Sequence, residues 1–477
     1  MAYRGYEPVI GLEIHVQLNT QSKIFSVDST HFGGSDNENT SPVSLGLPGA
    51  LPVLNEKAVE YAIKTGLALN CKIRKKSVFA RKNYFYPDLA KGYQISQHDE
   101  PICEHGYLEI ETSRGPKRIN IVRAHLEEDA GKSTHHGEFT LINYNRAGIP
   151  LLEVVSAPEL ETAEEAAEYA RSLRQVVRYL GVCDGNLEEG SLRCDVNVSV
   201  KKQGASTLGT RVEIKNINSF RFIEKAVEYE IDRQIDRLEQ GDKVLQETRL
   251  WDADKNRTFS MRTKEDAEDY RYFPDPDLLP LIVDDHMIEK IQRTLPELPR
   301  VRAQRFVAQL GLSQNDAKIL TAERELGDYF EQVAKLSGNE KASANWILTE
   351  VLREINANNI LFSELPLSPL NLARLIQLVD KQVISGKIAK TVFSEIWEKD
   401  LNPDELVQKK GLGQITDNSV VNQAIEKVLD ANPSQVAEYR SGKEKVFGFF
   451  VGAVMKETKG QASPDLVNKI LREKLKG

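Results

Sequence analysis

The sequence has 477 residues, with 63 lysines and arginines against 71 aspartates and glutamates, which gives a net charge of −8. This composition predicts a folded protein of about three domains, and it excludes a disordered chain or one coated with positive charge for nucleic acid. No apolar run reaches the roughly 18–20 residues of a membrane helix, and residues 1–8 form no apolar signal segment, so we expect a cytoplasmic protein.

The first predicted element is a strand over residues 9–18, where apolar and polar residues alternate. Its polar face carries Glu13 and His15. At this spacing the two side chains lie roughly 6–7 Å apart on one side of a strand. A carboxylate beside an imidazole suits a metal ion or acid–base chemistry. The alternative interpretation is a solvated face of the sheet.

The next polar feature is the segment 125–129, which reads His-Leu-Glu-Glu-Asp. Its consecutive carboxylates, Glu127 and Glu128 among them, repel one another unless a cation lies between them. An exposed turn is the alternative. Gly131-Lys132-Ser133 resembles the end of a phosphate-binding P-loop, but Leu126 stands where that pattern requires glycine.

Glu153 lies inside the apolar run of residues 149–155. Burying a carboxylate there is costly unless the group is paired or bound to a metal ion. The sequence therefore marks Glu153 as a candidate metal ligand. A structural salt bridge to an arginine such as Arg146 is the alternative.

Two helices, over residues 162–180 and 223–240, enclose a predicted antiparallel hairpin of residues 191–200 and 211–215. The polar face of this hairpin carries Arg193, Asp195 and Lys215. Side chains of both signs form either cross-strand ion pairs or a site for phosphate and magnesium. The earlier segment 81–97 interleaves basic and aromatic residues, which suits either stacking on nucleotides or an aromatic core strand.

After about Pro296 the strand pattern disappears, and helix starts recur as an N-cap residue followed by proline. A glycine-containing break follows at residues 409–413. The expected domains are therefore 1–292, 293–410 and 411–477. The capping pairs are Ser368-Pro369, Asn402-Pro403, Asn432-Pro433 and Ser463-Pro464.

Taken together, these segments resemble one family, the B subunits of the glutamyl/aspartyl-tRNA amidotransferases (GatB/GatE). The likeness is collinear over essentially the whole chain. The matching stretches are VIGLEIHVQL from Val9, SLGLPGALPVLN from Ser44, RKNYFYPDLAKGYQISQ from Arg81, HLEEDAGKSTH from His125, NRAGIPLLEVVSAPE from Asn145, LEEGSLRCDVNVS from Leu187, EIKNINSF from Glu213, DYRYFPDPDLLP from Asp269 and VGAVMKETKGQASPDLVNKIL from Val451.

The resemblance implies an α+β protein. A mixed, largely antiparallel cradle domain would precede a helical domain and a small helical, YqeY-like tail. It also implies that the chain binds a mischarged tRNA and uses ATP and Mg²⁺ to phosphorylate the aminoacyl side-chain carboxylate. The amidase, which is the A subunit of such enzymes, would supply the ammonia that displaces phosphate, and the small C subunit would complete the heterotrimer. A tRNA-binding scaffold without chemistry of its own is the alternative.

The resemblance also implies which residues act. The catalytic set would be Glu13, His15, Glu127, Glu153 and Asp195. Metal ligands would come from Glu13, His15, Glu127 and Glu153, with Glu128 and Glu189 as further candidates. Our own inference, rather than the resemblance, assigns Arg193, Lys215 or Lys132 to the phosphates of ATP.

The chain departs from the family pattern at two places. Many members carry Cys-x-Cys and Cys-x-x-Cys, where this chain has Ser26, Asp28, Ser41 and Ser44. No structural zinc is therefore expected. Asn143 also replaces a usual aspartate, which we expect to lie outside the direct metal ligands.

The segment from Ser441 onward carries eight basic and four acidic side chains, a net charge of +4. A basic end on an acidic protein fits a contact with the tRNA backbone, for which Lys443, Lys445 and Lys459 are the candidates. A solvated helix surface is the alternative.

Overall fold

The computed structural model describes residues 3–263, 270–413 and 418–476. Asp269, which begins one family stretch, and the side chain of Lys476 in the basic tail lie outside what is described. The chain divides into two compact units, Met1–Leu298 and Pro299–Gly477.

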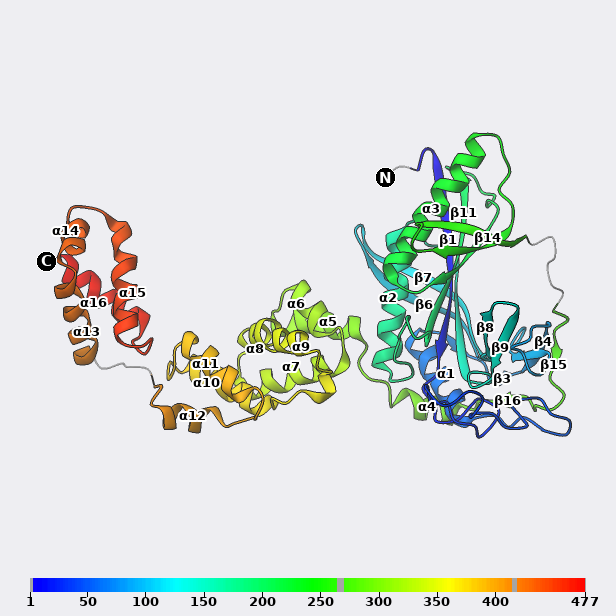
Figure 1. Cartoon of the computed structure of the whole chain (residues 1–477), viewed down its shortest axis with the longest axis horizontal. Helices are drawn as coiled ribbons and strands as arrows, with labels where there is room; N and C mark the ends of the chain where they lie inside the picture. The colour runs from blue at the N-terminus through cyan, green and yellow to red at the C-terminus, as the bar shows by residue number, and fades with distance from the viewer. Residues whose placement is uncertain (1–2, 264–269, 414–417, 477) are drawn as a thin grey trace. The chain divides into compact units, whose positions relative to one another are not determined.

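A nine-stranded sheet forms the body of the N-terminal unit (Figure 1), with the order β14-β13-β12-β11-β1-β10-β7-β6-β2. All of its pairs are antiparallel except β12 with β13. Its strands are β1 (Tyr6–Gln17), β2 (Lys72–Ile73), β6 (Cys103–Thr112), β7 (Gly115–Glu128), β10 (Pro150–Ser156), β11 (Leu192–Lys202), β12 (Val212–Ile217), β13 (Glu247–Asp252) and β14 (Arg257–Thr263).

The predicted alternation in β1 decides which face of the sheet is covered. Ile10, Leu12, Ile14 and Val16 are at most 1% exposed. They share one core with the helices α1 (Glu56–Ala68), α2 (Ala163–Tyr179) and α3 (Phe220–Glu239). Because side chains alternate along a strand, the polar residues of β1 lie on the opposite face. The predicted helices and the β11–β12 hairpin are confirmed.

Short strands and loops border the polar face. A three-stranded sheet, β15-β4-β5, and the hairpin β8–β9 are hydrogen-bonded separately from the main sheet. The short elements are β3 (Lys76–Ser77), β4 (Ala80–Asn83), β5 (Tyr93–Ser96), β8 (Lys132–His136), β9 (Phe139–Asn143), β15 (Phe273–Pro274), β16 (Leu281–Ile282) and α4 (Asp285–Gln292).

The named elements of the C-terminal unit are all helical, and each predicted Pro-initiated helix begins at its proline. The α-helices are α5 (Pro299–Leu310), α6 (Gln314–Leu320), α7 (Arg324–Ser337), α8 (Glu340–Trp346), α9 (Leu352–Asn358), α10 (Pro369–Asp380), α11 (Gly386–Ile396), α12 (Pro403–Lys410), α13 (Asn418–Ala431), α14 (Pro433–Arg440), α15 (Phe447–Glu457) and α16 (Pro464–Lys476). Shorter helical turns are η2 (Ile347–Val351), η3 (Phe362–Glu364) and η4 (Glu444–Val446).

The expected α+β class, with strands first and helices after, is confirmed. The division into three domains stays a prediction. We retain it because the helical unit holds two separate hydrophobic cores, one between Phe306 and Val407 and one between Val421 and Leu475. Among the residues that the structure describes, no helix is long and apolar enough to cross a membrane.

Candidate active site

Sheet register brings distant residues into one row on the polar face. His15 in β1 lies directly opposite Glu153 in β10 and Arg193 in β11. Glu153 lies in turn opposite His125 in β7. Four strands thus place Arg193, His15, Glu153 and His125 side by side, although these residues come from distant parts of the sequence.

Glu127 completes a compact cluster with His15 and Glu153. Nε2 of His15 lies 3.4 Å from Oε1 of Glu127 and 3.5 Å from Oε2 of Glu153. Nε2 of His125 lies 3.3 Å from the same Glu153 oxygen. One possible ligand atom from each of His15, Glu127 and Glu153 falls within 4.8 Å of the other two. Strands on either side hold this geometry, and Glu127 is only 3% exposed.

The electrostatics of the cluster favour a positive charge at its centre. Burial alone would lower the pKa of His15, but the hydrogen bond and charge of Glu153, with the charge of Glu127, outweigh it and raise the pKa to about 9. Burial and the neighbouring Glu153 raise the pKa of Glu127. Burial would raise the pKa of Glu153 too, but the two histidines hold it well below the usual range. Two carboxylates this close repel each other unless a cation lies between them.

Glu13 and Asp195 face each other across β1 and β11, one step along from the histidine row. The Nδ2 amide of Asn197 donates to Glu13 at 2.9 Å. Burial and the charge of Glu153 nevertheless raise the pKa of Glu13. Asp195 accepts from the Lys215 ammonium at 2.6 Å, and that ammonium also lies 3.1 Å from Glu213.

Two arginines gather on Asp129, just past the end of β7. Nη2 of Arg193 donates to its carboxylate at 2.6 Å, and Nε of Arg146 lies 3.4 Å away. Arg146 therefore pairs with Asp129, whereas the partners of Glu153 are histidines. The salt bridge considered for Glu153 and Arg146 is replaced by these contacts.

The remaining candidates lie apart from the cluster. Glu128 alternates to the other face of β7, where its carboxylate accepts from the Lys91 ammonium and from the backbone N–H of Ile95. Lys132 is exposed on β8, and Glu189 is exposed in the turn before β11. Asn143, at the end of β9, donates to Asp36. Their parts in the chemistry stay predictions.

Sequence reasoning did not select two residues that the fold adds to the site. His125 and Glu127 are two residues apart in β7 and therefore lie on the same face of the sheet. Alternation within the acidic segment could have identified His125. The Nζ of Lys82 in β4 lies over the faces of the Tyr84 and Tyr270 rings, 4.7 Å from the centre of the Tyr270 ring. Burial would lower the pKa of Lys82, but Glu127 and neighbouring tyrosines raise it. Nothing local in the sequence pairs β4 with residues near 270.

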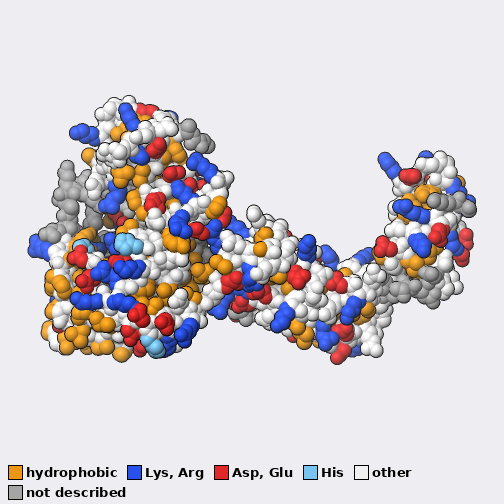
Figure 2. Space-filling view, turned by 180° about the vertical axis from the view of Figure 1, so that it is seen from behind, with side chains coloured by type: hydrophobic (Ala, Val, Ile, Leu, Met, Phe, Trp, Pro, Cys, Tyr) orange, Lys and Arg blue, Asp and Glu red, His pale blue; other side chains and the backbone are white. Residues whose placement is uncertain are grey.

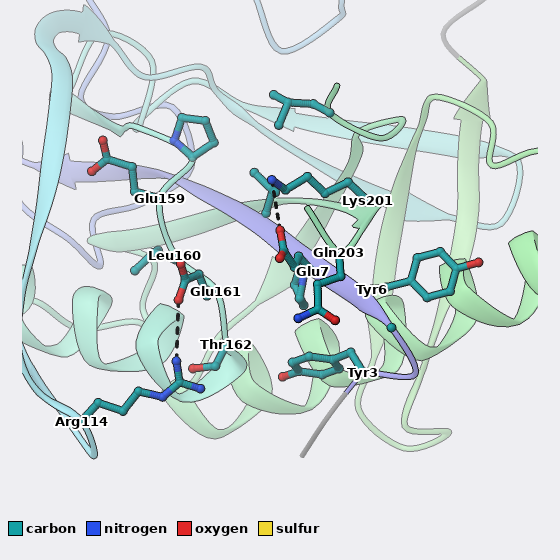
Figure 3. Close-up of a pocket in the computed structure, with 15 residues that line it drawn as sticks. Tyr3, Tyr6, Glu7, Arg114, Glu159, Leu160, Glu161, Thr162, Lys201 and Gln203 are labelled. Carbon is teal, nitrogen blue, oxygen red and sulfur yellow. Dashed lines mark ion pairs between the residues drawn. The ribbon is translucent and has the colours of Figure 1, made fainter. Parts of the chain in front are cut away.

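A separate hollow lies beside the start of β1 (Figure 3). It has a volume of about 540 Å³. Four of its charged side chains pair with one another, Lys201 with Glu7 at 3.1 Å and Arg114 with Glu161 at 3.9 Å. The N-terminus of α2 nearby is satisfied by Thr162 and Glu165. The remaining charged side chain, Glu159, accepts from Asn120, so each charge that lines the hollow already has a partner within the protein.

The donor set of the cluster suits a hard divalent cation. Carboxylate oxygens are the preferred ligands of Mg²⁺, and one imidazole is compatible with Mg²⁺ or Mn²⁺. The mutual repulsion of Glu127 and Glu153 supplies the local reason for a cation there. The residues therefore fit the metal that the resemblance implies.

Comparison with known proteins covers the whole chain. A family model described as the GatB/GatE catalytic domain matches residues 8–289, and one described as the GatB domain matches residues 328–475. The B subunit of the aspartyl/glutamyl-tRNA(Asn/Gln) amidotransferase of Bdellovibrio bacteriovorus is 65% identical over 477 residues, which is 100% of both chains. The proteins of the same name from Syntrophotalea carbinolica and Geobacter sulfurreducens are 55% identical over 473 residues and 54% identical over 478 residues. They cover 99% of this chain, and the chain covers 99% and 100% of them.

Proposed function

The chain belongs to the GatB/GatE family, and from this premise we propose that it is the B subunit of a tRNA-dependent amidotransferase. It converts the side-chain carboxylate of glutamate on tRNA(Gln), of aspartate on tRNA(Asn), or of both, into the amide. The observation that carries this proposal is the cluster of His15, Glu127 and Glu153 on the polar face of the main sheet, in a chain similar to such subunits over its full length.

The chemistry follows from the poor reactivity of a carboxylate. One carboxylate oxygen attacks the γ-phosphorus of ATP, and the bond to the β–γ bridging oxygen breaks to release ADP. Ammonia then attacks the acyl carbon, and inorganic phosphate leaves with the oxygen it gained. Phosphoryl transfer of this kind depends on positioning and charge, with little covalent help from the protein.

Each part of the site has a role in these two reaction steps. Glu13, His15, Glu127, Glu153 and Asp195 form the acidic face that would hold Mg²⁺. The bound ion would neutralise phosphoryl oxygens and polarise them toward attack. Arg193 and Lys215 add fixed positive charge beside the cluster, each held in place by a carboxylate. Glu128 already accepts from Lys91 and Ile95, so we propose a structural role for it.

The partners of this chain in the heterotrimer are the amidase and the small C subunit, and its substrate is the mischarged tRNA. Exposed apolar side chains support a protein partner on the cradle, because a lone soluble domain seldom gathers them on neighbouring loops. Hydrophobic side chains gather along the lower edge of the N-terminal unit in Figure 2, where Figure 1 shows the loop before α1. That loop exposes Val27, Phe32, Leu51 and Val53 by 62–92%.

The first test measures ATP turnover in the reconstituted heterotrimer. We expect ADP release to require both mischarged tRNA and Mg²⁺, and we expect a chelator to abolish both ADP release and amide formation. Re-addition of Mg²⁺ or Mn²⁺ should restore them. ATP turnover without any tRNA would indicate a stand-alone phosphotransferase. Normal tRNA binding with no metal-dependent turnover would indicate a scaffold.

A second prediction concerns the basic tail. Lys443, Lys445 and Lys459 are exposed in the C-terminal unit. Replacing all three by alanine should weaken tRNA binding and lower the slope of log K against log salt by about one for each phosphate that a lysine no longer neutralises. Filter binding at several salt concentrations measures this slope. An unchanged slope would place the tRNA contact elsewhere, with the catalytic proposal left standing if ATP turnover is normal.

A further inference from the structure

One carboxylate organises the long loop between β1 and α1. Oδ2 of Asp28 accepts from the hydroxyls of Ser26 and Ser41, each at 2.9 Å, and from the backbone N–H of Ser41 at 3.0 Å. The Ser44 hydroxyl donates to the same oxygen. The hydroxyls of Ser26 and Ser44 also lie 3.2 Å apart. Four donors from two turns of the loop therefore converge on a single oxygen atom.

The cluster holds the loop against the body of the cradle. The backbone N–H of Lys23 donates to the carbonyl of Asp28, and the Lys23 ammonium donates to the carbonyl of Asn39 at 2.6 Å, so the two turns are tied together twice. The N–H of Ile24 donates to the carbonyl of Gly148, just before β10. The side chain of Lys23 is fully buried in this junction. Loss of the cluster would therefore loosen the loop and its attachment to the backbone just before β10.

The family pattern that the chain resembles has cysteines at these four positions in many members, and that resemblance implies a structural zinc ion there. The donor set in this chain does not fit zinc, because three neutral hydroxyls replace thiolates and all three donate to Oδ2 of Asp28. A cation needs lone pairs aimed at the centre, whereas this centre is an oxygen that accepts hydrogen bonds. The centre of this cluster therefore carries a negative charge, where a zinc site would carry a positive one.

We propose that Oδ2 of Asp28 takes the structural place of a metal ion in this loop. The Asp28 carboxylate, which accepts from four donors, links the same two turns of the loop that a zinc ion bound by four thiolates would link. Hydrogen bonds to a charged acceptor are stronger than neutral ones, which makes a carboxylate the effective group at this position. Two consequences follow. The loop is stable without metal, and its four positions are arranged so that thiolates placed there would form a zinc site.

The deciding experiment installs the missing ligands. The variant Ser26→Cys/Asp28→Cys/Ser41→Cys/Ser44→Cys should bind one zinc ion per chain, measured by elemental analysis after gel filtration. Cobalt substitution should give the absorption bands of tetrahedral thiolate coordination. The parent chain is the matched control, because its own cysteines, Cys71, Cys103, Cys183 and Cys194, are buried and free. A folded variant that retains no zinc would overturn the proposal.

A second measurement decides the matter if that variant does not fold. Asp28→Asn keeps the shape of the side chain but removes its charge, and it also introduces two donors where four already converge. We expect the melting temperature of the N-terminal unit to fall by roughly 4 °C or more, and the loop to become cleavable by protease. Ser35→Ala, in the same loop but outside the cluster, should change neither. Equal stability of Asp28→Asn and the parent would overturn the proposal, and neither outcome depends on amidotransferase activity.

Discussion

Replacing Glu153 by glutamine is expected to lower the rate of amide formation on mischarged tRNA by about 100-fold or more. Glu153 lies within 3.5 Å of both His15 and His125, so its charge acts on the whole cluster. Removing one buried charge from a site built for a cation typically costs two orders of magnitude or more. The measurement is single-turnover conversion in the reconstituted heterotrimer at saturating ATP and Mg²⁺.

The same substitution has a second readout that does not depend on activity. Without the negative charge of Glu153, the pKa of His15, about 9 in the parent, should fall toward its ordinary value. His15 binds its proton more tightly in the folded state, so it contributes stability that is complete below its unfolded pKa of 6.5 and is lost as the pH rises through about 9. Nuclear magnetic resonance titration of the histidine should show the shift directly.

The control for this prediction is Glu60→Gln, which removes a partly exposed carboxylate on α1 that pairs with Lys57. It should leave turnover and the histidine titration unchanged. Binding of tRNA should be the same in both variants, because neither lies in the basic tail. If Glu153→Gln retained full turnover, the cluster would be structural and the scaffold interpretation would take its place.

The individual strands and helices could be predicted because local sequence patterns determine them. Alternation in residues 9–18 fixes which side chains of β1 are buried, and the proline-initiated helices begin where capping chemistry requires. Strand order could not be predicted in this way. It depends on pairings between strands that are far apart in the sequence, such as β1 between β10 and β11, for which no local residue gives a signal.

The site shows the same division. Glu13, His15 and Glu153 could be selected because a titratable side chain in an apolar or alternating strand needs an explanation. Which of them touch depends on register, because a shift of one residue would turn His15 away from Glu153. Glu127 and Glu128 illustrate the limit. They are adjacent in the sequence, yet one lies in the cluster and the other pairs with Lys91 on the opposite face.

The cations of the site were the least predictable part. Arg193, Lys215 and Lys132 look equivalent in the sequence, as basic residues near acidic ones. In the structure, Arg193 lies in the row with His15, and Asp129 holds its guanidinium. Asp195 and Glu213 hold Lys215, whereas Lys132 is exposed on a separate hairpin. Positive charge fixed by a buried partner costs less to position during phosphoryl transfer than charge on a mobile surface side chain.

Exchanging Arg193 for methionine should therefore lower kcat for tRNA-dependent ATP turnover by about 10²–10³-fold. Methionine preserves much of the apolar contact, and Asp129 keeps Arg146 as a partner, so the fold should survive. Lys132→Met should lower turnover by no more than about threefold, because an exposed charge is well screened. Parallel steady-state assays over a range of ATP concentrations separate kcat from KM. A larger loss in Lys132→Met than in Arg193→Met would place the transferred phosphoryl group nearer the β8–β9 hairpin, and the roles of the two cations would have to be exchanged. Equal losses would contradict the leading role given to Arg193.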